Sequence, residues 1–245
     1  FMILCDQQKE VEQVQHDLAF FKDNGIAIKV FPDWETLIYD PFSPHQDIIS
    51  ERLSLLYDIL QQKPMVLILS LHTLLHRLPP KEFLHQQVFK ITSGETLPLQ
   101  KFKENLINAQ YQMVSIVQNH GEFSPKGAIL DVFPMGCEQP IRIEWFDDEI
   151  ESMRWFDPQS QLSLEKISEL RVLPAKEFSL DETSIRSFRQ RFREQFTGNL
   201  HRCPIYEHVT QKEPMQGLEY YLPLFFEQTN SFFDYLPSDY QILFS

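Results

Sequence analysis

Short apolar runs of strand length alternate with amphipathic helical segments over residues 1–88, and this alternation constrains the fold more than any other feature. The runs 1–5, 26–31 and 66–69 have the length and composition of buried strands. A stripe at helical spacing follows the first run, with Asp6 as its expected N-cap, and comprises Val11, Val14, Leu18 and Phe21. Because strands that alternate with helices pair in parallel, we predict an α/β fold with a parallel sheet.

A second helix is expected to begin at Ser43. Serine is a favoured N-cap, Pro44 suits the first helical position, and Gln46 stands where a capping box needs a polar side chain. Helical spacing of apolar residues continues to about Gln62, where we expect the helix to end.

The pattern changes near residue 89, where short strands follow one another with turn residues between them. The expected strands are 89–91, 113–118, 127–133, 141–146 and 149–156, with a helix near 98–108. This spacing is typical of antiparallel hairpins.

We therefore predict three parts of the chain. Residues 1–88 form an α/β half-domain, and residues 89–174 form an inserted α+β domain with antiparallel hairpins. Residues 175–245 form a return segment that completes the first domain and contains a helix near 181–196. Aromatic residues of the tail are interleaved with Leu and Pro, which favours core positions over a base-stacking surface for Tyr220, Tyr221, Phe225, Phe226, Phe232 and Phe233.

Composition limits the function classes. The formal net charge is −13, whereas surfaces that bind nucleic acid or anionic membranes neutralise phosphates with Lys and Arg. Three widely separated cysteines, Cys5, Cys137 and Cys203, are typical of a reducing, cytoplasmic setting without disulfides. No apolar run reaches membrane length. The apolar start at Phe1 suggests a fragment of a longer chain.

No pattern of a catalytic or cofactor site is present in the sequence. None of the seven glycines forms a G-x-G-x-x-G or G-x-x-x-x-G-K-[ST] loop, which a nucleotide phosphate needs. The acidic string 147–149 is better explained as a hairpin turn than as a metal site. His72 and His76 have a zinc-compatible spacing but no third ligand in the sequence, and we interpret them as helix-surface residues. A second group, His201, Cys203 and His208, lacks a fourth ligand.

Two features suggest binding surfaces. In the strand 141–146, Arg142 and Phe146 share the face opposite the core, and both are residue types that dominate interface hot spots. Packing of Phe146 under a loop explains the pattern equally well. Lys126, placed early in the preceding strand, lies near Arg142 if the strands pair, although an ordinary solvated lysine is the default. The helix expected near 181–196 has a basic face that carries Arg186, Arg189, Arg191 and Arg193. We interpret this face as exposed to solvent in preference to a phosphate-binding surface.

Five blocks of sequence carry a family resemblance. They occupy residues 31–37, 39–53, 121–136, 142–152 and 217–226. In this order they resemble the UvrB-homology module at the N-terminus of bacterial transcription-repair coupling factors. Together they span nearly the whole chain, which makes the resemblance far more specific than any single block.

The resemblance implies a degenerate nucleotide fold of the RecA/helicase type, split by the inserted domain. It also implies that the inserted domain binds UvrA and recruits it to RNA polymerase stalled at DNA damage. The family's UvrA-contacting positions fall on Lys126, Arg142 and Phe146. The full-length family protein is an ATP-dependent DNA translocase that uses ATP and Mg, with its DNA- and polymerase-binding domains outside this chain.

The chain also departs from the family pattern. The basic position is often Arg, whereas Lys126 cannot make bidentate contacts. Only Pro41 and Phe42 separate Asp40 from Ser43, which leaves no room for the long Tyr-rich DNA hairpin of UvrB. This favours the coupling factor. A UvrB-like binder of damaged DNA and a helicase fragment remain the alternatives.

Overall fold

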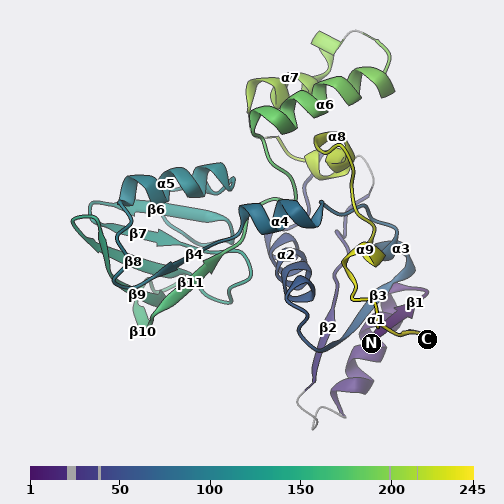
Figure 1. The fold of residues 1–245 in the computed structure, drawn as a ribbon, viewed down its shortest axis with the longest axis horizontal. Coiled ribbons are helices and arrows are strands. Elements are labelled where there is room, and N and C mark those ends of the chain that lie inside the picture. Colours follow the sequence, from purple (N-terminus) through teal and green to yellow (C-terminus); the bar gives the residue numbers. More distant parts are fainter. Residues whose placement is uncertain (21–25, 38–39, 199, 214) are drawn as a thin grey trace.

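The computed structural model describes residues 1–20, 26–37, 40–198, 200–213 and 215–245. Figure 1 shows two lobes, each built on its own sheet, with helices α6 and α7 above them. The fold is mixed α/β, as the sequence predicts, with a parallel sheet, a largely antiparallel sheet and a two-stranded antiparallel ribbon. Among the described residues, no helix is long and apolar enough to span a membrane.

The first lobe contains a four-stranded parallel sheet. Its strands lie in the order β12-β1-β3-β2 and span Met2–Cys5 (β1), Ala27–Val30 (β2), Met65–Ser70 (β3) and Ile242–Phe244 (β12). Strand β12 lies near the C-terminal end of the chain and pairs with β1, so the return segment supplies one edge strand of this sheet. All three strand pairings are parallel, which confirms the prediction for this part of the chain.

Helix α1 (Gln8–Ala19) packs on the parallel sheet. Its Val11 is buried in one cluster with Cys5 and Ile68, and Val14 and Leu18 pack at the edge of that cluster. The N-cap is Gln7 instead of the expected Asp6. Phe21, expected in the same stripe, lies outside the described residues.

Helix α2 (Gln46–Leu60) begins later than predicted. Its N-cap is His45, whose side chain accepts a hydrogen bond from the Asp47 amide. Ser43 is not the cap, because its hydroxyl donates to Glu219 Oε2 at 2.7 Å and accepts the Gly217 amide at 3.0 Å. A tertiary partner 176 residues away has replaced the local capping interaction.

The second lobe contains a six-stranded sheet in the order β10-β9-β8-β7-β6-β5. The strands span Gln112–Met113 (β5), Glu122–Lys126 (β6), Ile129–Val132 (β7), Ile141–Phe146 (β8), Glu149–Phe156 (β9) and Ser163–Ile167 (β10). All pairings are antiparallel except β5 with β6. The predicted hairpins are confirmed, but the strand expected at 113–118 is only two residues long and β6 was not foreseen.

One face of the six-stranded sheet is covered by helix α5 (Leu99–Asn108), near the predicted position (Figure 1). Its buried residues Phe102 and Leu106 belong to the main core, and the Phe102 ring lies 5.7 Å from that of Trp145. A separate ribbon pairs β4 (Phe89–Thr92) with β11 (Glu169–Val172). Helices α3 (Leu71–Leu74) and α4 (Lys81–Gln87) connect the lobes along the chain.

The return segment adds helices α6 (Glu182–Gln195), α7 (Pro204–Gln211), α8 (Leu222–Phe225) and α9 (Phe232–Tyr235). Short 3₁₀ turns occupy Leu200–Arg202 and Leu218–Tyr221. A stacked aromatic core joins α6 to α8, in which Phe188 and Phe178 both contact the ring of Phe225. Core burial of the tail aromatics is confirmed for Phe225 and Phe232 but is wrong for Phe233, which is 44% exposed.

Candidate functional site

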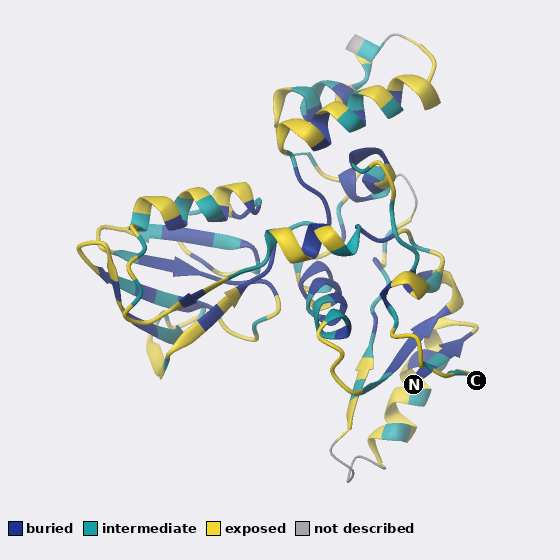
Figure 2. Ribbon diagram, viewed as in Figure 1, coloured by how far each residue is buried: buried dark blue, intermediate teal, exposed yellow. Residues whose placement is uncertain are grey.

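The outer face of the six-stranded sheet carries the residues singled out on strand β8. Side chains of this strand alternate between buried and more exposed, as its period of two predicts (Figure 2). Trp145 points into the core, where its indole N–H donates to the carbonyl of Leu97 at 2.8 Å. Arg142 and Phe146 therefore both project from the opposite face.

A buried carboxylate, Asp131 on β7, connects Lys126 with Arg142. Arg142 donates through Nε to Oδ1 at 2.7 Å and through Nη2 to Oδ2 at 3.0 Å, which is a bidentate pair. Lys126 Nζ reaches Oδ2 at 3.1 Å. Asp131 is fully buried, so this one acid fixes both cations.

The sequence suggested that Lys126 lies early in a strand, but it is the last residue of β6. The Gly127 turn follows with a φ of +67°, a conformation that favours glycine. Strand β7 lies between β6 and β8, so Lys126 is not a neighbour of Arg142 across one strand pair. The two residues meet only through Asp131, and the Lys126 side chain stays 45% exposed.

Arg142 is held from several sides. Its guanidinium carbon lies 4.9 Å from the centre of the Phe156 ring, and Nη1 donates to the carbonyl of Gln161 at 3.3 Å. The hydrogen bond with Asp131 raises the pKa of Arg142 above its usual value. The side chain remains 20% exposed, so a fixed cation reaches the surface.

Phe146 is the last residue of β8 and is 69% exposed. Of the two explanations that the sequence left open, packing under a loop is therefore wrong for this side chain. The Asp147-Asp148 turn follows, with a φ of +52° at Asp147, and leads into β9. The acidic string is a hairpin turn, as predicted.

Further basic side chains lie beside Arg142 on the same face. Arg154 on β9 is directly opposite Arg142, and Lys166 on β10 is opposite Arg154. Phe146 lies four residues along β8 from this row, and its neighbours on the same face are Glu144 and the cross-strand residue Glu149. A face with an exposed aromatic and a separate row of cations suits a partner surface that offers an apolar pocket and, apart from it, acidic groups.

Comparison with known proteins finds a family that matches the region containing this face. Residues 89–178 match the UvrB interaction domain. These residues belong to that family. Lys126, Arg142 and Phe146 all lie within the matched region.

The resemblance to coupling factors is also confirmed, over nearly the whole chain. The chain is 45% identical to the transcription-repair-coupling factor of Haemophilus influenzae over 210 residues, covering 85% of this chain and 18% of that protein. It is 43% identical to that of Escherichia coli over 239 residues, covering 97% of this chain and 21% of that protein. The Rickettsia prowazekii factor is 30% identical over 237 residues, 96% of this chain and 21% of its own length. The chain spans about a fifth of the length of these relatives, all of which are named for the coupling of transcription to repair.

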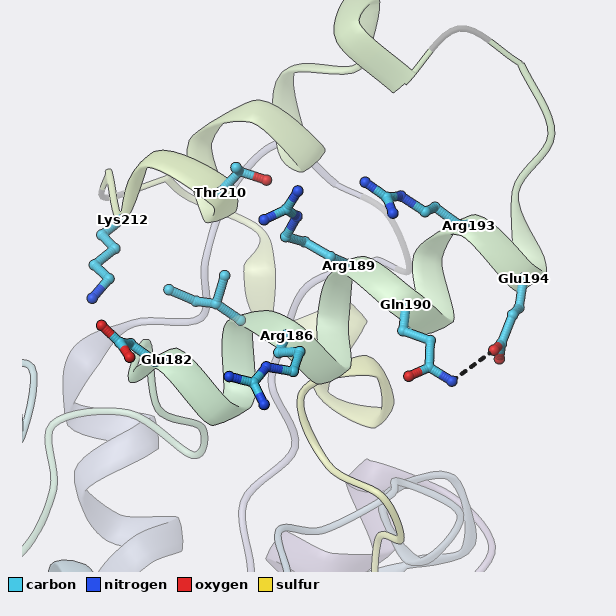
Figure 3. Close-up of a pocket in the computed structure, with 9 residues that line it drawn as sticks. Glu182, Arg186, Arg189, Gln190, Arg193, Glu194, Thr210 and Lys212 are labelled. Carbon is cyan, nitrogen blue, oxygen red and sulfur yellow. Dashed lines mark hydrogen bonds between the residues drawn. The ribbon is translucent and has the colours of Figure 1, made fainter.

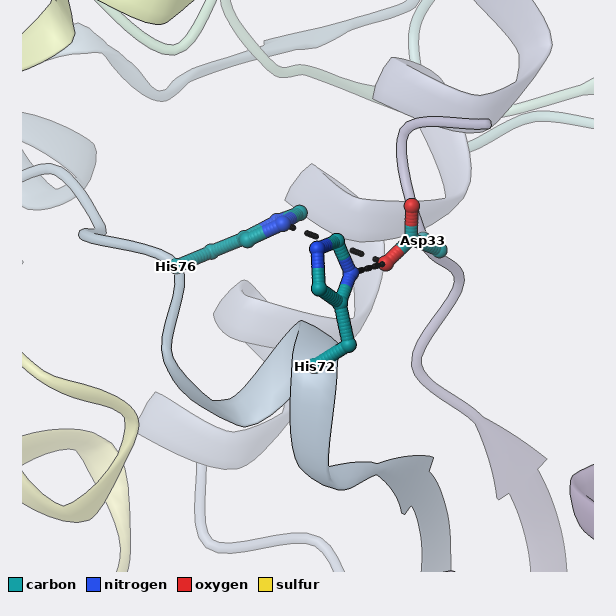
Figure 4. Close-up of side chains that lie close together, drawn as sticks. All are labelled: Asp33, His72 and His76. Carbon is teal, nitrogen blue, oxygen red and sulfur yellow. Dashed lines mark hydrogen bonds and ion pairs between the residues drawn. The ribbon is translucent and has the colours of Figure 1, made fainter. Parts of the chain in front are cut away.

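A cluster of metal-binding residue types lies outside the UvrB interaction domain (Figure 4). Asp33 Oδ2 is 2.9 Å from His72 Nδ1 and 3.9 Å from His76 Nε2. His76 is not a helix-surface residue, because its side chain is only 15% exposed and its ring lies 4.8 Å from that of Trp34. Burial, and then the charge of Arg52, lowers the pKa of His76 to about 4.

Asp33 could not be predicted as the third member of this cluster from sequence spacing, because it lies 39 residues before His72. Among the described residues, Cys203 and His208 of the second group do not belong to such a cluster. His208 pairs with Glu213 at 3.0 Å, and Cys203 precedes helix α7. The side chain of His201 lies outside the described residues.

A basic hollow of about 660 Å³ lies between α6 and α7, also outside the UvrB interaction domain (Figure 3). Its charged lining residues are Arg186, Arg189, Arg193, Lys212, Glu182 and Glu194. Arg191 points elsewhere and donates to the carbonyl of Glu227 at 2.8 Å. Three of the four arginines therefore line one hollow. The sequence predicted only a solvent-exposed basic face, without a hollow.

Proposed function

We propose that this chain is a non-catalytic docking module that binds UvrA and so recruits it to RNA polymerase stalled at DNA damage. The observation that carries the proposal is the exposed Phe146 on the same face of β8 as the fixed cation Arg142, in a region that matches the UvrB interaction domain. The family name indicates an interaction surface, and the relatives' names supply the repair context.

Phe146 has the properties of an interface anchor. A phenylalanine that is 69% exposed at the end of a hairpin leaves apolar area in water, which a partner pocket would remove. The strand fixes the backbone at Phe146 before binding, so docking costs mainly the rotamer freedom of one side chain.

Arg142 and Lys126 contribute orientation. Asp131 and the Phe156 ring restrict the Arg142 guanidinium, and its Nη1 donates to Gln161 and Ser163, so it offers the partner a fixed positive charge and one remaining N–H on Nη2. Lys126 is more exposed and acts as a point charge, which steers approach and adds less directional bonding.

Binding of UvrA to single-residue variants tests the proposal. Phe146→Ala and Arg142→Ala should each weaken binding by about 2 kcal/mol or more, roughly 30-fold, in isothermal titration calorimetry. Phe42→Ala is the matched control, because Phe42 is 63% exposed but lies in the other lobe. Its affinity should equal that of the parent chain. Unchanged affinity in the Phe146→Ala, Arg142→Ala double variant, with circular dichroism showing a folded chain, would refute the site.

The wider role extends beyond these residues. In this proposal the full-length protein is a cytoplasmic ATP-dependent DNA translocase that uses ATP and Mg and binds RNA polymerase and DNA through other domains. The parallel sheet of this chain is a degenerate nucleotide fold that needs no nucleotide. The domain boundaries at residues 88/89 and 174/175 remain predictions.

A second candidate function is binding of nucleic-acid phosphates in the basic hollow. Arg186, Arg189 and Arg193 face it from one helix, with Lys212 at its rim. Duplex DNA binding that weakens steeply with salt, and that Arg189→Ala plus Arg193→Ala abolishes, would support this function. Salt-insensitive or absent DNA binding would count against it.

A further inference from the structure

We propose that Asp33, His72 and His76 form a binding site for one divalent transition-metal ion of the zinc class. All three side chains offer a donor atom, and these atoms lie within 4.8 Å of one another. This site is separate from the proposed docking surface, because none of its residues falls within residues 89–178.

The donor spacing is close to that of a tetrahedral zinc site. Metal–nitrogen and metal–oxygen bonds of about 2.0 Å place neighbouring donors ~3.3 Å apart. Asp33 Oδ2 lies 2.9 Å from His72 Nδ1 and 3.9 Å from His76 Nε2, so the two distances lie on either side of this value. The two histidine donors lie within 4.8 Å of each other, so side-chain shifts of up to about 1.5 Å would bring the three atoms around one ion.

The carboxylate is already oriented by neighbouring donors. Thr73 Oγ1 donates to Asp33 Oδ2 at 2.8 Å, and the Glu35 amide donates to Oδ1 at 3.1 Å. Hydrogen bonds of this kind to a ligating carboxylate are a common outer shell of protein metal sites.

The ligands come from elements that are fixed relative to each other. Asp33 follows β2, and His72 and His76 follow β3, which pairs with β2 in parallel (Figure 4). The cluster therefore lies beyond the carboxyl ends of adjacent parallel strands, where α/β sheets generally bind ligands.

Besides these side-chain shifts, binding requires that His72 Nδ1 carries no proton. In the tautomer with the proton on Nε2, His72 presents the Nδ1 lone pair where it now contacts Asp33, and Nε2–H can face water because the side chain is 66% exposed. The positive charge of Arg52 disfavours a second cation near His76. Glu177, 2.8 Å from Arg52, balances that charge. Three protein ligands leave one position for water or for a further ligand.

Titration of the metal-free chain with Zn²⁺ in calorimetry tests the site. We expect one ion per chain, and His72→Ala should weaken binding at least about tenfold. Because His72 is exposed, this variant should fold normally, which circular dichroism checks. His85→Ala, on helix α4, is the control and should bind like the parent chain.

Co²⁺ provides an independent readout. Four-coordinate Co²⁺ with nitrogen and oxygen ligands should give visible absorption bands that His72→Ala and Asp33→Asn remove, without the near-ultraviolet charge-transfer band of a cobalt thiolate. A thiolate band, Zn²⁺ affinity that His72→Ala leaves unchanged, or no stoichiometric binding by the parent chain would each overturn the proposal.

Discussion

At the residue scale, the proposed docking face depends on a side chain that does not reach the surface. Asp131 is fully buried and receives hydrogen bonds from Arg142 and Lys126. Without it, Lys126 would lose this ion pair, and Arg142 would keep only the weaker contacts with Phe156, Gln161 and Ser163. The role of Asp131 is to convert flexible charges into fixed ones, which reduces the entropy lost when a partner binds.

Replacing Asp131 with Ala should therefore destabilise the chain by roughly 2–3 kcal/mol, because it removes charge-assisted hydrogen bonds. This loss of stability is smaller than the loss on breaking a fully buried ion pair, since Arg142 and Lys126 can turn towards water. Urea unfolding at pH 7 measures the change. Asp131→Asn keeps the shape and should cost less than Asp131→Ala. A loss below about 0.5 kcal/mol in the Ala variant would show that the acid is not structurally important.

At the element scale, helix α6 shows how a local cap sets where a helix begins. Asp181 is its N-cap, and its carboxylate accepts the Ser184 amide at 2.8 Å. Burial alone would raise the pKa of Asp181, but the hydrogen bonds from Ser184 and Ser179 outweigh it, and the pKa lies below its usual value. The charged form is therefore the one that stabilises the helix.

The sign of the pH dependence follows from this lowered pKa. Stabilisation by Asp181 is present above its unfolded pKa and is lost as pH falls through the lower folded value. Asp181→Ala should cost about 1 kcal/mol at pH 7, as N-cap removal usually does. Urea unfolding at pH 7 and near pH 3 should show the difference between parent and variant shrinking with acidification. A constant difference would mean that the carboxylate charge does not contribute.

At the scale of the whole molecule, a buried ion pair joins segments far apart in the chain. Arg52 on α2 and Glu177 at the start of the return segment are both fully buried, with Nε and Oε1 2.8 Å apart. Arg52 also donates to the carbonyl of Pro32 at 2.8 Å, and its guanidinium carbon lies 4.5 Å from the Phe31 ring centre. The pair connects the first lobe to the chain as it leaves the UvrB interaction domain.

Breaking this pair on one side should be costly. Arg52→Met leaves the Glu177 carboxylate buried without its cation and should destabilise the chain by roughly 3–5 kcal/mol in urea unfolding. The double variant Arg52→Met, Glu177→Met removes both charges and should recover part of that loss. If the double variant is less stable than the single one, the buried charges contribute favourably beyond pairing with each other.

The sequence by itself determined the features that depend on neighbours along the chain. The alternation of β8 placed Arg142 and Phe146 on one face because side chains of a strand alternate whatever the strand packs against. The hairpin at Asp147-Asp148 and the α6 helix were predictable for the same reason, since turn residues and caps act locally.

Only the tertiary structure decided which distant side chains meet. Asp131 links Lys126 to Arg142 because β7 lies between their strands, and Asp33 reaches His72 because β2 pairs with β3. The Ser43 hydroxyl bonds to Glu219 instead of capping helix α2, and sequence spacing does not reveal this partner. Local patterns fix the direction of a side chain along its element, whereas its partners depend on how the sheets and helices pack.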